Sequence, residues 1–110
     1  MQDNNSALEI SKFLSLHNAL NTVVLDVRKK CSWTDYFVVA TITSTGHLKG
    51  LTRELWNFLV SLNIHPLNRH KTPDISGWEL IDCGNIVIHL MSEELRKYYS
   101  IEELFIEEIF

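Results

Sequence analysis

Apolar residues follow two different spacings along the chain, and each spacing predicts one kind of element. Apolar residues every three or four positions predict amphipathic helices over Ser6–Leu20 and His47–Leu62, because such residues share one face of a helix. Runs of β-branched and aliphatic residues predict strands over Thr22–Arg28 and Asp35–Ile42. The second run is apolar on both sides, which is typical of an inner strand. A short strand or irregular piece is expected over Leu67–Lys71.

The segment Trp78–Met91 predicts a β-hairpin with a tight turn at Cys83-Gly84. A two-residue loop in a primed turn needs positive φ angles, which glycine adopts without steric cost. This turn would place Trp78 opposite His89 in the neighbouring strand. The other predicted pairs are Asp82 with Asn85, Ile81 with Ile86, and Leu80 with Val87.

Because side chains alternate along a strand, the predicted hairpin has two different faces. One face is suited to a core and carries Ile81, Cys83, Ile86, Ile88 and Leu90. The other face is apolar at its centre and polar at its ends, and carries Trp78, Leu80, Val87, His89 and Met91. We expect this second face to be left uncovered, since an exposed apolar patch with a polar rim usually marks an interaction site.

Capping signals precede the expected helices. They are Ser6 with Glu9, Ser44 or Thr45, Ser92, and Ser100 with Glu103. The last two predict short helices over Glu93–Tyr99 and from Ile101 to about Ile109. The tail that follows Met91 carries more apolar surface than so short a segment usually buries.

The elements together predict an α/β fold formed by a single domain over residues 1–110. A helix between the second and third strands permits a crossover connection, so we expect a five-stranded mixed sheet. The predicted helices are too few to cover both faces of such a sheet, and we therefore expect them mainly on one face.

Composition and charge argue against a general nucleic-acid binder, a membrane-spanning protein and a secreted protein. The net charge is −4, and the one basic cluster, Arg28-Lys29-Lys30, is smaller than the basic stripe expected of a general nucleic-acid binder. No apolar run reaches the ~18 residues needed to span a membrane, and the first residues do not resemble a signal peptide. We expect a cytoplasmic protein in which Cys31 and Cys83 are free thiols, with a disulfide between them as the alternative.

Catalytic signatures are missing from the sequence, which contains no P-loop, C-x-x-C, H-E-x-x-H or G-x-S-x-G motif. A metal site at His65 and His70 is a minor alternative, because these residues share no ligand spacing. The segment Thr43–Gly46 precedes a helix, where free backbone N–H groups can bind a phosphate. An ordinary helix cap explains the same residues more simply.

An enzyme is the second hypothesis for the whole chain. Asp26, Asp35 and Asp82 are candidate paired carboxylates for metal-assisted phosphoryl chemistry, although hydrogen bonding at strand ends is favoured for them. On this hypothesis the protein is a small nucleotidyltransferase that uses Ser44, Asp26 and Asp82 with magnesium. A homodimeric adaptor whose apolar face pairs with itself is the third hypothesis.

Linked blocks of sequence, in order, resemble the Iojap family of ribosomal silencing factors, known as RsfS. The blocks are Asp35–Thr41, Ser44 and His47, Trp78-x-Leu80-Ile81-Asp82-x-Gly84-x-Ile86-Val87-Ile88-His89, and Arg96-x-x-Tyr99-x-Ile101-Glu102-x-Leu104. The match runs from about Leu8 to Phe105. The chain departs from the usual family pattern at Ile42, Cys83, Asn85 and Phe105, where Gly, Tyr, Asp and Trp are common.

The resemblance implies a nucleotidyltransferase-like α/β sheet without catalytic residues, and no cofactor or metal. It also implies binding to the large ribosomal subunit through ribosomal protein fourteen, which blocks joining of the subunits. Translation would be repressed when nutrients are scarce, as in stationary phase. No membrane and no direct sequence-specific nucleic-acid binding are expected, and the free protein is a candidate homodimer.

The expected partner-binding surface combines the resemblance with the second hairpin face. Its centre is Trp78, Leu80, Val87, His89 and Met91, extended by Tyr98, Tyr99, Leu104 and Phe105. An acidic rim is expected from Glu93, Glu94, Glu102 and Glu103. An apolar centre with an acidic surround suits a basic ribosomal protein, because opposite potentials speed encounter and set orientation.

Overall fold

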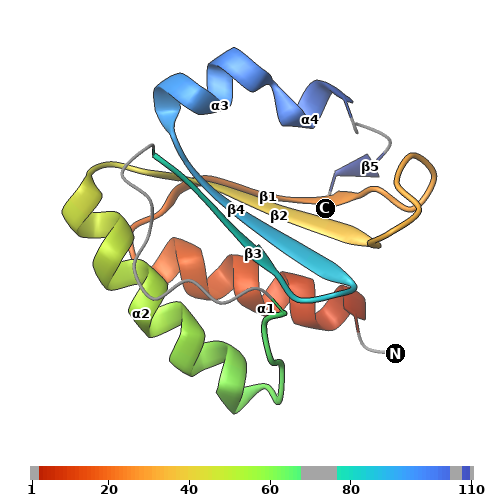
Figure 1. Cartoon of the computed structure of the whole chain (residues 1–110), viewed down its shortest axis with the longest axis horizontal. Coiled ribbons are helices and arrows are strands. Elements are labelled where there is room, and N and C mark those ends of the chain that lie inside the picture. The colour runs from red at the N-terminus through yellow and green to blue at the C-terminus, as the bar shows by residue number, and fades with distance from the viewer. Residues whose placement is uncertain (1–2, 68–76, 105–107, 110) are drawn as a thin grey trace.

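The computed structural model describes residues 3–67, 77–104 and 108–109. The chain folds into one sheet with helices on both of its faces (Figure 1). The elements are α1 Asp3–Leu16, β1 Leu20–Asp26, β2 Tyr36–Ile42, α2 Thr45–Ser61, β3 Trp78–Asp82, β4 Ile86–Ser92, α3 Glu93–Tyr99, α4 Ile101–Leu104 and β5 Glu108–Ile109. Among these residues no helix is long and apolar enough to cross a membrane.

The sheet is mixed, as predicted. Its strand order is β3-β4-β2-β1-β5, with β2 and β4 parallel and every other neighbouring pair antiparallel. All seven residues of β2 are buried, as are the first six of β4. The two central strands are therefore covered on both faces, which agrees with the two-sided apolar pattern of Asp35–Ile42.

The predicted count of five full strands was wrong. Four strands have five to seven residues, and the sheet is completed by β5, a strand of only two residues. The predicted fifth strand was the segment Leu67–Lys71, whereas β5 is formed by Glu108–Ile109. Leu67 lies in a bend and donates its N–H to the Asp82 carbonyl at 2.7 Å, and residues 68–71 lie outside the described residues.

The C-terminal helix expected from Ile101 to about Ile109 was also too long. The α4 helix ends at Leu104, and β5 pairs with Leu25 and Asp26 of β1. This pairing satisfies backbone groups on the outer side of β1, which a helix at the same position would leave to water. Pairing with a distant strand is a tertiary effect that the local pattern does not contain.

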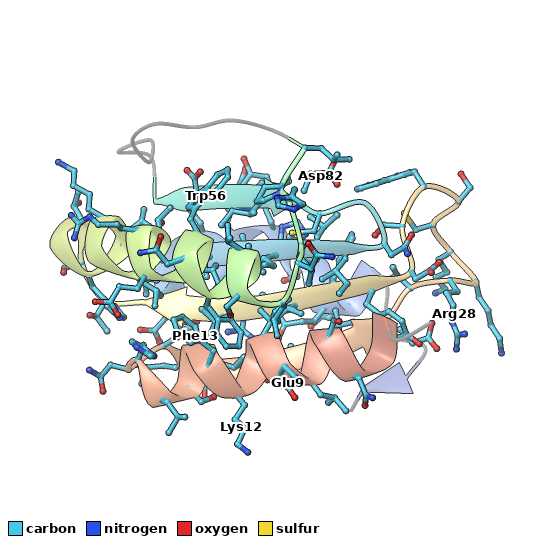
Figure 2. The ribbon with its side chains drawn as sticks, turned by 90° about the horizontal axis from the view of Figure 1, so that it is seen from below. Glu9, Lys12, Phe13, Arg28, Trp56 and Asp82 are labelled. Atoms are coloured by element: carbon cyan, nitrogen blue, oxygen red, sulfur yellow. The ribbon has the colours of Figure 1, made fainter. Side chains whose placement is uncertain are left out.

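Most helical residues lie on one face of the sheet, as expected, and two short helices cover part of the other face (Figure 1). The two long helices, α1 and α2, cover the lower face in Figure 1, while α3 and α4 cover part of the upper face. Each face has its own buried cluster. The larger one includes Ile10, Leu55 and Ile88, and the smaller one includes Phe37, Met91 and Ile101. In Figure 2 Phe13 lies between α1 and α2, where it stacks on Phe58 with ring centroids 4.4 Å apart.

The hairpin exists, but its register differs from the prediction by two residues. Trp78 lies opposite Met91 and Leu80 opposite His89, and the turn is centred on Gly84-Asn85. Gly84 has φ +89°, and its N–H donates to the Asp82 carboxylate at 2.9 Å. Because the error is an even number of residues, the predicted core face is preserved.

Two of the predicted caps are confirmed. Ser44 and Ser92 cap α2 and α3, and each side chain accepts a backbone N–H bond from three residues further on. The capping box at Ser6 was wrong, because α1 already begins upstream of that residue. Ser100 is not an N-cap through its side chain either: it has φ +48°, and its hydroxyl donates to the Lys97 carbonyl.

Candidate functional site

A row of neighbouring ring side chains crosses the upper face of the sheet. Adjacent ring centroids lie 4.6 to 6.2 Å apart, within or near the range in which aromatic rings attract one another. This aromatic row consists, in spatial order, of Tyr98, Tyr99, Trp78, His89, Phe37 and Trp33. It begins at the end of α3, passes over β3, β4 and β2, and ends in the loop between β1 and β2.

The middle of this face is covered, so the expectation of an uncovered sheet was wrong there. Val87 and Met91 are fully buried, and His89 is only 4% exposed. Leu95 and Ile101, from the two short helices, pack into the same cluster. The apolar tail that follows Met91 is itself the cover. Val87, His89 and Met91 therefore lie beneath the surface, where they support the residues above them.

Trp78 and His89 form a hydrogen bond within the aromatic row. The indole Nε1–H of Trp78 donates to Nδ1 of His89 at 3.2 Å. His89 therefore carries its proton on Nε2, an atom with no hydrogen-bond partner among the described residues. Burial lowers the pKa of His89 to about 4, because the charged imidazolium would lose its hydration. The ring is neutral at pH 7 and acts as a fixed acceptor for Trp78.

The exposed end of the row and Leu80, which lies two residues after Trp78 in β3, form a patch that we call the aromatic patch, made of Trp78, Leu80, Tyr98 and Tyr99. Tyr98 is 78% exposed, Tyr99 46% and Leu80 36%, while Trp78 is half-buried. The Tyr99 ring lies 5.0 Å from that of Trp78 and 4.9 Å from that of Tyr98. Large rings fixed by their neighbours and open to solvent are typical anchors of a protein interface.

The carboxylates expected to form an acidic rim lie on α3 and α4, and they are not equivalent. Glu94 and Glu103 are exposed. Glu93 is exposed as well and pairs with Lys97 at 3.5 Å on the surface of α3, an ion pair of little energetic weight. Glu102 bonds to Arg96 and serves the fold. The acidic rim expected from the sequence is thus reduced to its solvent-facing members.

Arg96 belongs to a block of the family resemblance, but its structural role was not predicted from the sequence. It is 9% exposed and lies between the sheet and α4. Its Nη1 donates to Thr41 Oγ1 of β2 at 2.8 Å, and its Nε and Nη2 donate to the two carboxylate oxygens of Glu102 at 3.1 and 2.7 Å. This bidentate pair fixes the angle between α3 and α4 and, with it, the position of Tyr98 and Tyr99.

Two of the predicted partner-contact residues have no described side chain. Leu104 is the last residue of α4, and the structure describes its backbone but not its side chain. Phe105 lies outside the described residues. Their assignment to the partner-binding surface stays a prediction.

The carboxylates and serine of the magnesium hypothesis lie far apart. Asp26 ends β1 and Asp82 ends β3, so β2 and β4 stand between them, a separation of about 14 Å at normal strand spacing. Ser44 lies beyond the opposite end of β2, about 20 Å along the strand. Arg28 binds both oxygens of Asp26, and this hydrogen-bonded guanidinium lowers the pKa of the carboxyl.

The smaller alternatives from the sequence find no support in the described residues. No group of three or more His, Cys, Asp or Glu side chains there could hold a metal ion. His65 is exposed, and His70 lies outside the described part of the chain. At the start of α2 the Ser44 side chain already accepts the His47 N–H at 3.0 Å, so this segment is a helix cap.

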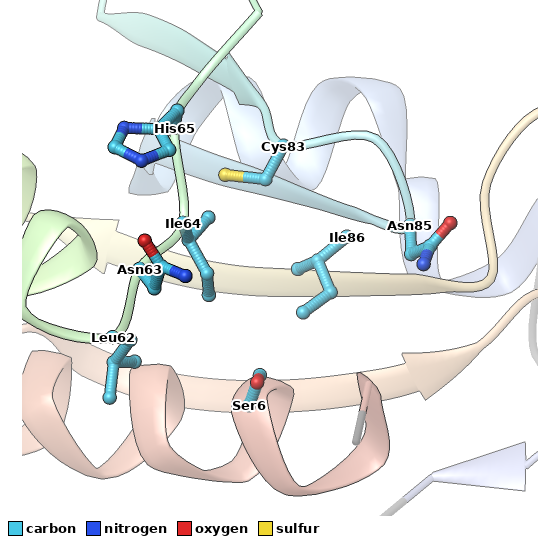
Figure 3. Close-up of a pocket in the computed structure, with 8 residues that line it drawn as sticks. All are labelled: Ser6, Leu62, Asn63, Ile64, His65, Cys83, Asn85 and Ile86. Carbon is cyan, nitrogen blue, oxygen red and sulfur yellow. The ribbon is translucent and has the colours of Figure 1, made fainter. Parts of the chain in front are cut away.

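A pocket of about 310 Å³ opens between the start of α1, the end of α2 and the hairpin turn (Figure 3). Its lining includes Cys83 and His65, a pairing that suggests thiol chemistry. Burial raises the pKa of the Cys83 thiol to about 12, so the thiolate needed for nucleophilic attack is scarce at neutral pH. Both cysteines are free thiols, as expected from the sequence.

The fold and the patch define a small α/β protein with an exposed aromatic contact patch and no assembled catalytic group among the residues described. A family model described as "Ribosomal silencing factor during starvation" matches residues 1–109. The chain therefore belongs to the RsfS family, which confirms the resemblance found in the sequence. The family name points to a regulatory factor that acts without catalysis.

Known relatives agree with this membership. The chain is 30% identical to the ribosomal silencing factor RsfS of Treponema pallidum, over 94% of this chain and 93% of that protein. It is 34% identical to the mouse protein "Mitochondrial assembly of ribosomal large subunit protein 1", over 83% of this chain but only 41% of the relative. A crystal structure of a Chromobacterium violaceum protein superimposes with a TM-score of 0.80 at 25% identity, covering 97% of this chain and 86% of that one.

Proposed function

We propose that this protein binds the large ribosomal subunit through ribosomal protein fourteen and blocks joining of the two subunits, which represses translation when nutrients are scarce. Such a factor acts in the cytoplasm, as a binder and not as an enzyme. The observation that carries the proposal is the aromatic patch on a chain of the RsfS family. The names of two relatives, a ribosomal silencing factor and a large-subunit assembly protein, support it.

The patch suits a basic protein partner. Its apolar rings supply area that leaves water on binding, and the exposed carboxylates of Glu94 on α3 and Glu103 on α4 would attract a basic partner. The rings are also held before binding, because Tyr99 packs on Trp78 and Trp78 bonds to His89. Less side-chain entropy is then lost in the complex.

Blocking of the subunits needs no chemistry, only a surface complementary to one subunit and bulk that collides with the other. The separated positions of Ser44, Asp26 and Asp82 give no support to the magnesium-dependent alternative. We also infer that the sheet is related to the nucleotidyltransferases in fold alone.

The test is a variant with Leu80→Ser and Tyr98→Ser. Both side chains are exposed, so we expect unfolding stability to change by no more than about 0.5 kcal/mol. Loss of two anchors should weaken co-sedimentation with purified large subunits at least tenfold and restore joined ribosomes in a subunit-association gradient. Trp78→Ala is a poorer test, because it also removes the donor to a buried histidine.

A matched control places the same change on the opposite layer of the molecule. Leu16→Ser with Val60→Ser removes two exposed apolar side chains, 73% and 55% exposed, from α1 and α2. This control should bind like the wild type. Equal binding by both variants would reject the aromatic patch as the docking surface. Light scattering tests the homodimer hypothesis. If the patch variant no longer self-associates but still binds ribosomes, the aromatic patch is a dimer interface and not the ribosome-docking surface.

A further inference from the structure

The loop between β1 and β2 carries exposed cations beside an exposed aromatic ring. We call residues Arg28–Trp33 the basic loop. Arg28, Lys29 and Lys30 are exposed at its start, and Trp33 is 60% exposed at its end. In Figure 1 this loop projects beyond one end of the sheet, and in Figure 2 Arg28 stands at the edge of the molecule.

The base of the loop is held firmly although its tip is exposed. Val27 is fully buried and donates its N–H to the Asp35 carbonyl at 3.0 Å, which closes the base of the loop. The Val27 carbonyl accepts N–H bonds from Lys30 and Cys31 at 3.1 and 2.8 Å, and the Cys31 side chain is buried. A loop fixed in this way loses little conformational entropy when it binds a partner.

The three cations have different roles. The Arg28 guanidinium bonds both carboxylate oxygens of Asp26 and lies over the Tyr36 ring, 5.4 Å from its centroid. Arg28 therefore secures the base of the loop, with its charge balanced by a neighbour. Lys29 and Lys30 follow Arg28 in the loop and are exposed, on a protein whose net charge is −4.

Trp33 is held so that much of its ring stays in contact with solvent. Its ring lies 6.2 Å from that of Phe37, tilted by 48°, and Phe37 itself is 3% exposed. Trp33 is thus the free end of the aromatic row that begins at Tyr98. An exposed indole on a rigid support, in the same short loop as two exposed lysines, offers a base a surface for stacking and its phosphates a source of positive charge.

We propose that the basic loop binds ribosomal RNA, with Lys29 and Lys30 on backbone phosphates and Trp33 stacked on an unpaired base. The inference rests on the proposed function, which brings the protein to a surface where basic proteins and RNA lie side by side. An acidic peptide would engage the lysines equally well, but it would leave the indole without a planar partner. The contact is independent of base sequence, since phosphates and the faces of all bases offer the same chemistry.

The placement of the two surfaces supports a division of roles. Trp78 pairs with Met91 at the end of the hairpin far from its turn, whereas β2 begins next to Ile86, at the turn end. The basic loop immediately precedes β2 and so lies at the opposite end of the sheet from Trp78. One end of the molecule offers rings and carboxylates to a basic protein, and the other offers lysines and a ring to RNA.

The test measures binding to purified large subunits over a range of salt concentrations. We expect Lys29→Gln with Lys30→Gln to lower the slope of log affinity against log salt by about 1 to 1.4, because each phosphate left without its lysine removes roughly 0.7 from that slope. Trp33→Ala should weaken binding about five- to tenfold at one salt concentration. Lys12→Gln with Lys49→Gln is the charge-matched control on α1 and α2, and its slope should equal that of the wild type.

The outcomes separate this inference from the proposed function. Wild-type protein that fails to bind large subunits overturns both. Normal binding with an unchanged slope in the loop variant, or an equal loss in the control, overturns the RNA contact alone. A photo-crosslinking residue in place of Trp33 identifies the neighbour: a product that ribonuclease shortens supports the inference, and a crosslink to protein only refutes it. All variants should keep the aromatic-patch interaction with isolated ribosomal protein fourteen.

Discussion

Removing the Glu102 carboxylate should destabilise the protein more than removing the Arg96 guanidinium that binds it. The Arg96 side chain is 10% exposed, whereas that of Glu102 is 29% exposed. Glu102→Ala leaves a nearly buried cation with the Thr41 hydroxyl as its remaining partner, whereas Arg96→Met leaves a carboxylate that water can reach. The asymmetry follows from burial, because an unpaired charge is costly in proportion to its lost hydration.

The magnitudes follow from breaking a buried ion pair, which costs about 3–5 kcal/mol when one charge is stranded. We take the lower limit, about 3 kcal/mol, for Glu102→Ala, because one hydrogen bond to Arg96 remains. Arg96→Met keeps the packing of the aliphatic stem and should cost about 1–2 kcal/mol. The double variant strands no charge, so its cost should be about 1–2 kcal/mol, less than that of Glu102→Ala alone.

Urea unfolding followed by tryptophan fluorescence measures these differences, with thermal scans as a second readout. For a chain of this length a loss of about 3 kcal/mol lowers the midpoint by roughly 12 °C. A cost below about 1 kcal/mol for Glu102→Ala would refute the proposed asymmetry. The asymmetry would also be refuted if the destabilisation of the double variant equalled the sum of those of Glu102→Ala and Arg96→Met, because additive effects indicate uncoupled sites.

Other residues give independent predictions. Because burial lowers the pKa of His89 to about 4, the unfolded chain binds this proton more readily between about pH 6.5 and 4. The free energy of unfolding should be highest above that window and fall by about 2–3 kcal/mol across it on acidification. His89→Gln should flatten this dependence of stability on pH, measured by urea titrations at several pH values. Parallel pH profiles for the variant and the wild type would contradict the lowered pKa of His89. Gly77→Ala should cost more than Gly84→Ala, because both have positive φ but the new Cβ at Gly77 would lie 3.2 Å from Ser92 Oγ. Gly50→Ala, in an open position on α2, should gain about 0.5–1 kcal/mol in thermal scans, and another order among the three glycines would contradict the roles given to them.

The local parts of the fold could be predicted from the sequence because their signals are local. Ser44 and Ser92 are followed by helical spacing and do cap α2 and α3, and the Asp35–Ile42 run is a central strand. The predicted turn lies one residue too early, since glycine fits more than one position of a two-residue loop. The bond from the Gly84 N–H to the Asp82 carboxylate helps to fix the observed turn, and the pattern of apolar residues does not reveal it.

The parts that failed depend on contacts between distant segments. The face below α3 and α4 looked open because no sequence pattern shows that Leu95 and Ile101 fold back onto it. The unusual apolar richness of the tail was the one signal in the sequence that pointed to this cover. The structural role of Arg96 could not be predicted, although it stands in a block of the family resemblance, because it meets Thr41 and Glu102 only in the folded chain. Tyr98 and Tyr99 are exposed, as a contact role requires, but their assignment to a partner-binding surface stays a prediction.

The parallel pairing of β2 with β4 determines the order in which the sheet can form while the chain is being synthesised. During synthesis β2 emerges early, but its neighbour on one side is not made until Ser92 has left the ribosome, when more than four-fifths of the chain exists. The helices that carry Tyr98 and Tyr99 follow later still. A nascent chain that has not reached Tyr99 therefore lacks a complete set of contact rings, and one that ends before β4 lacks the central strand pair as well.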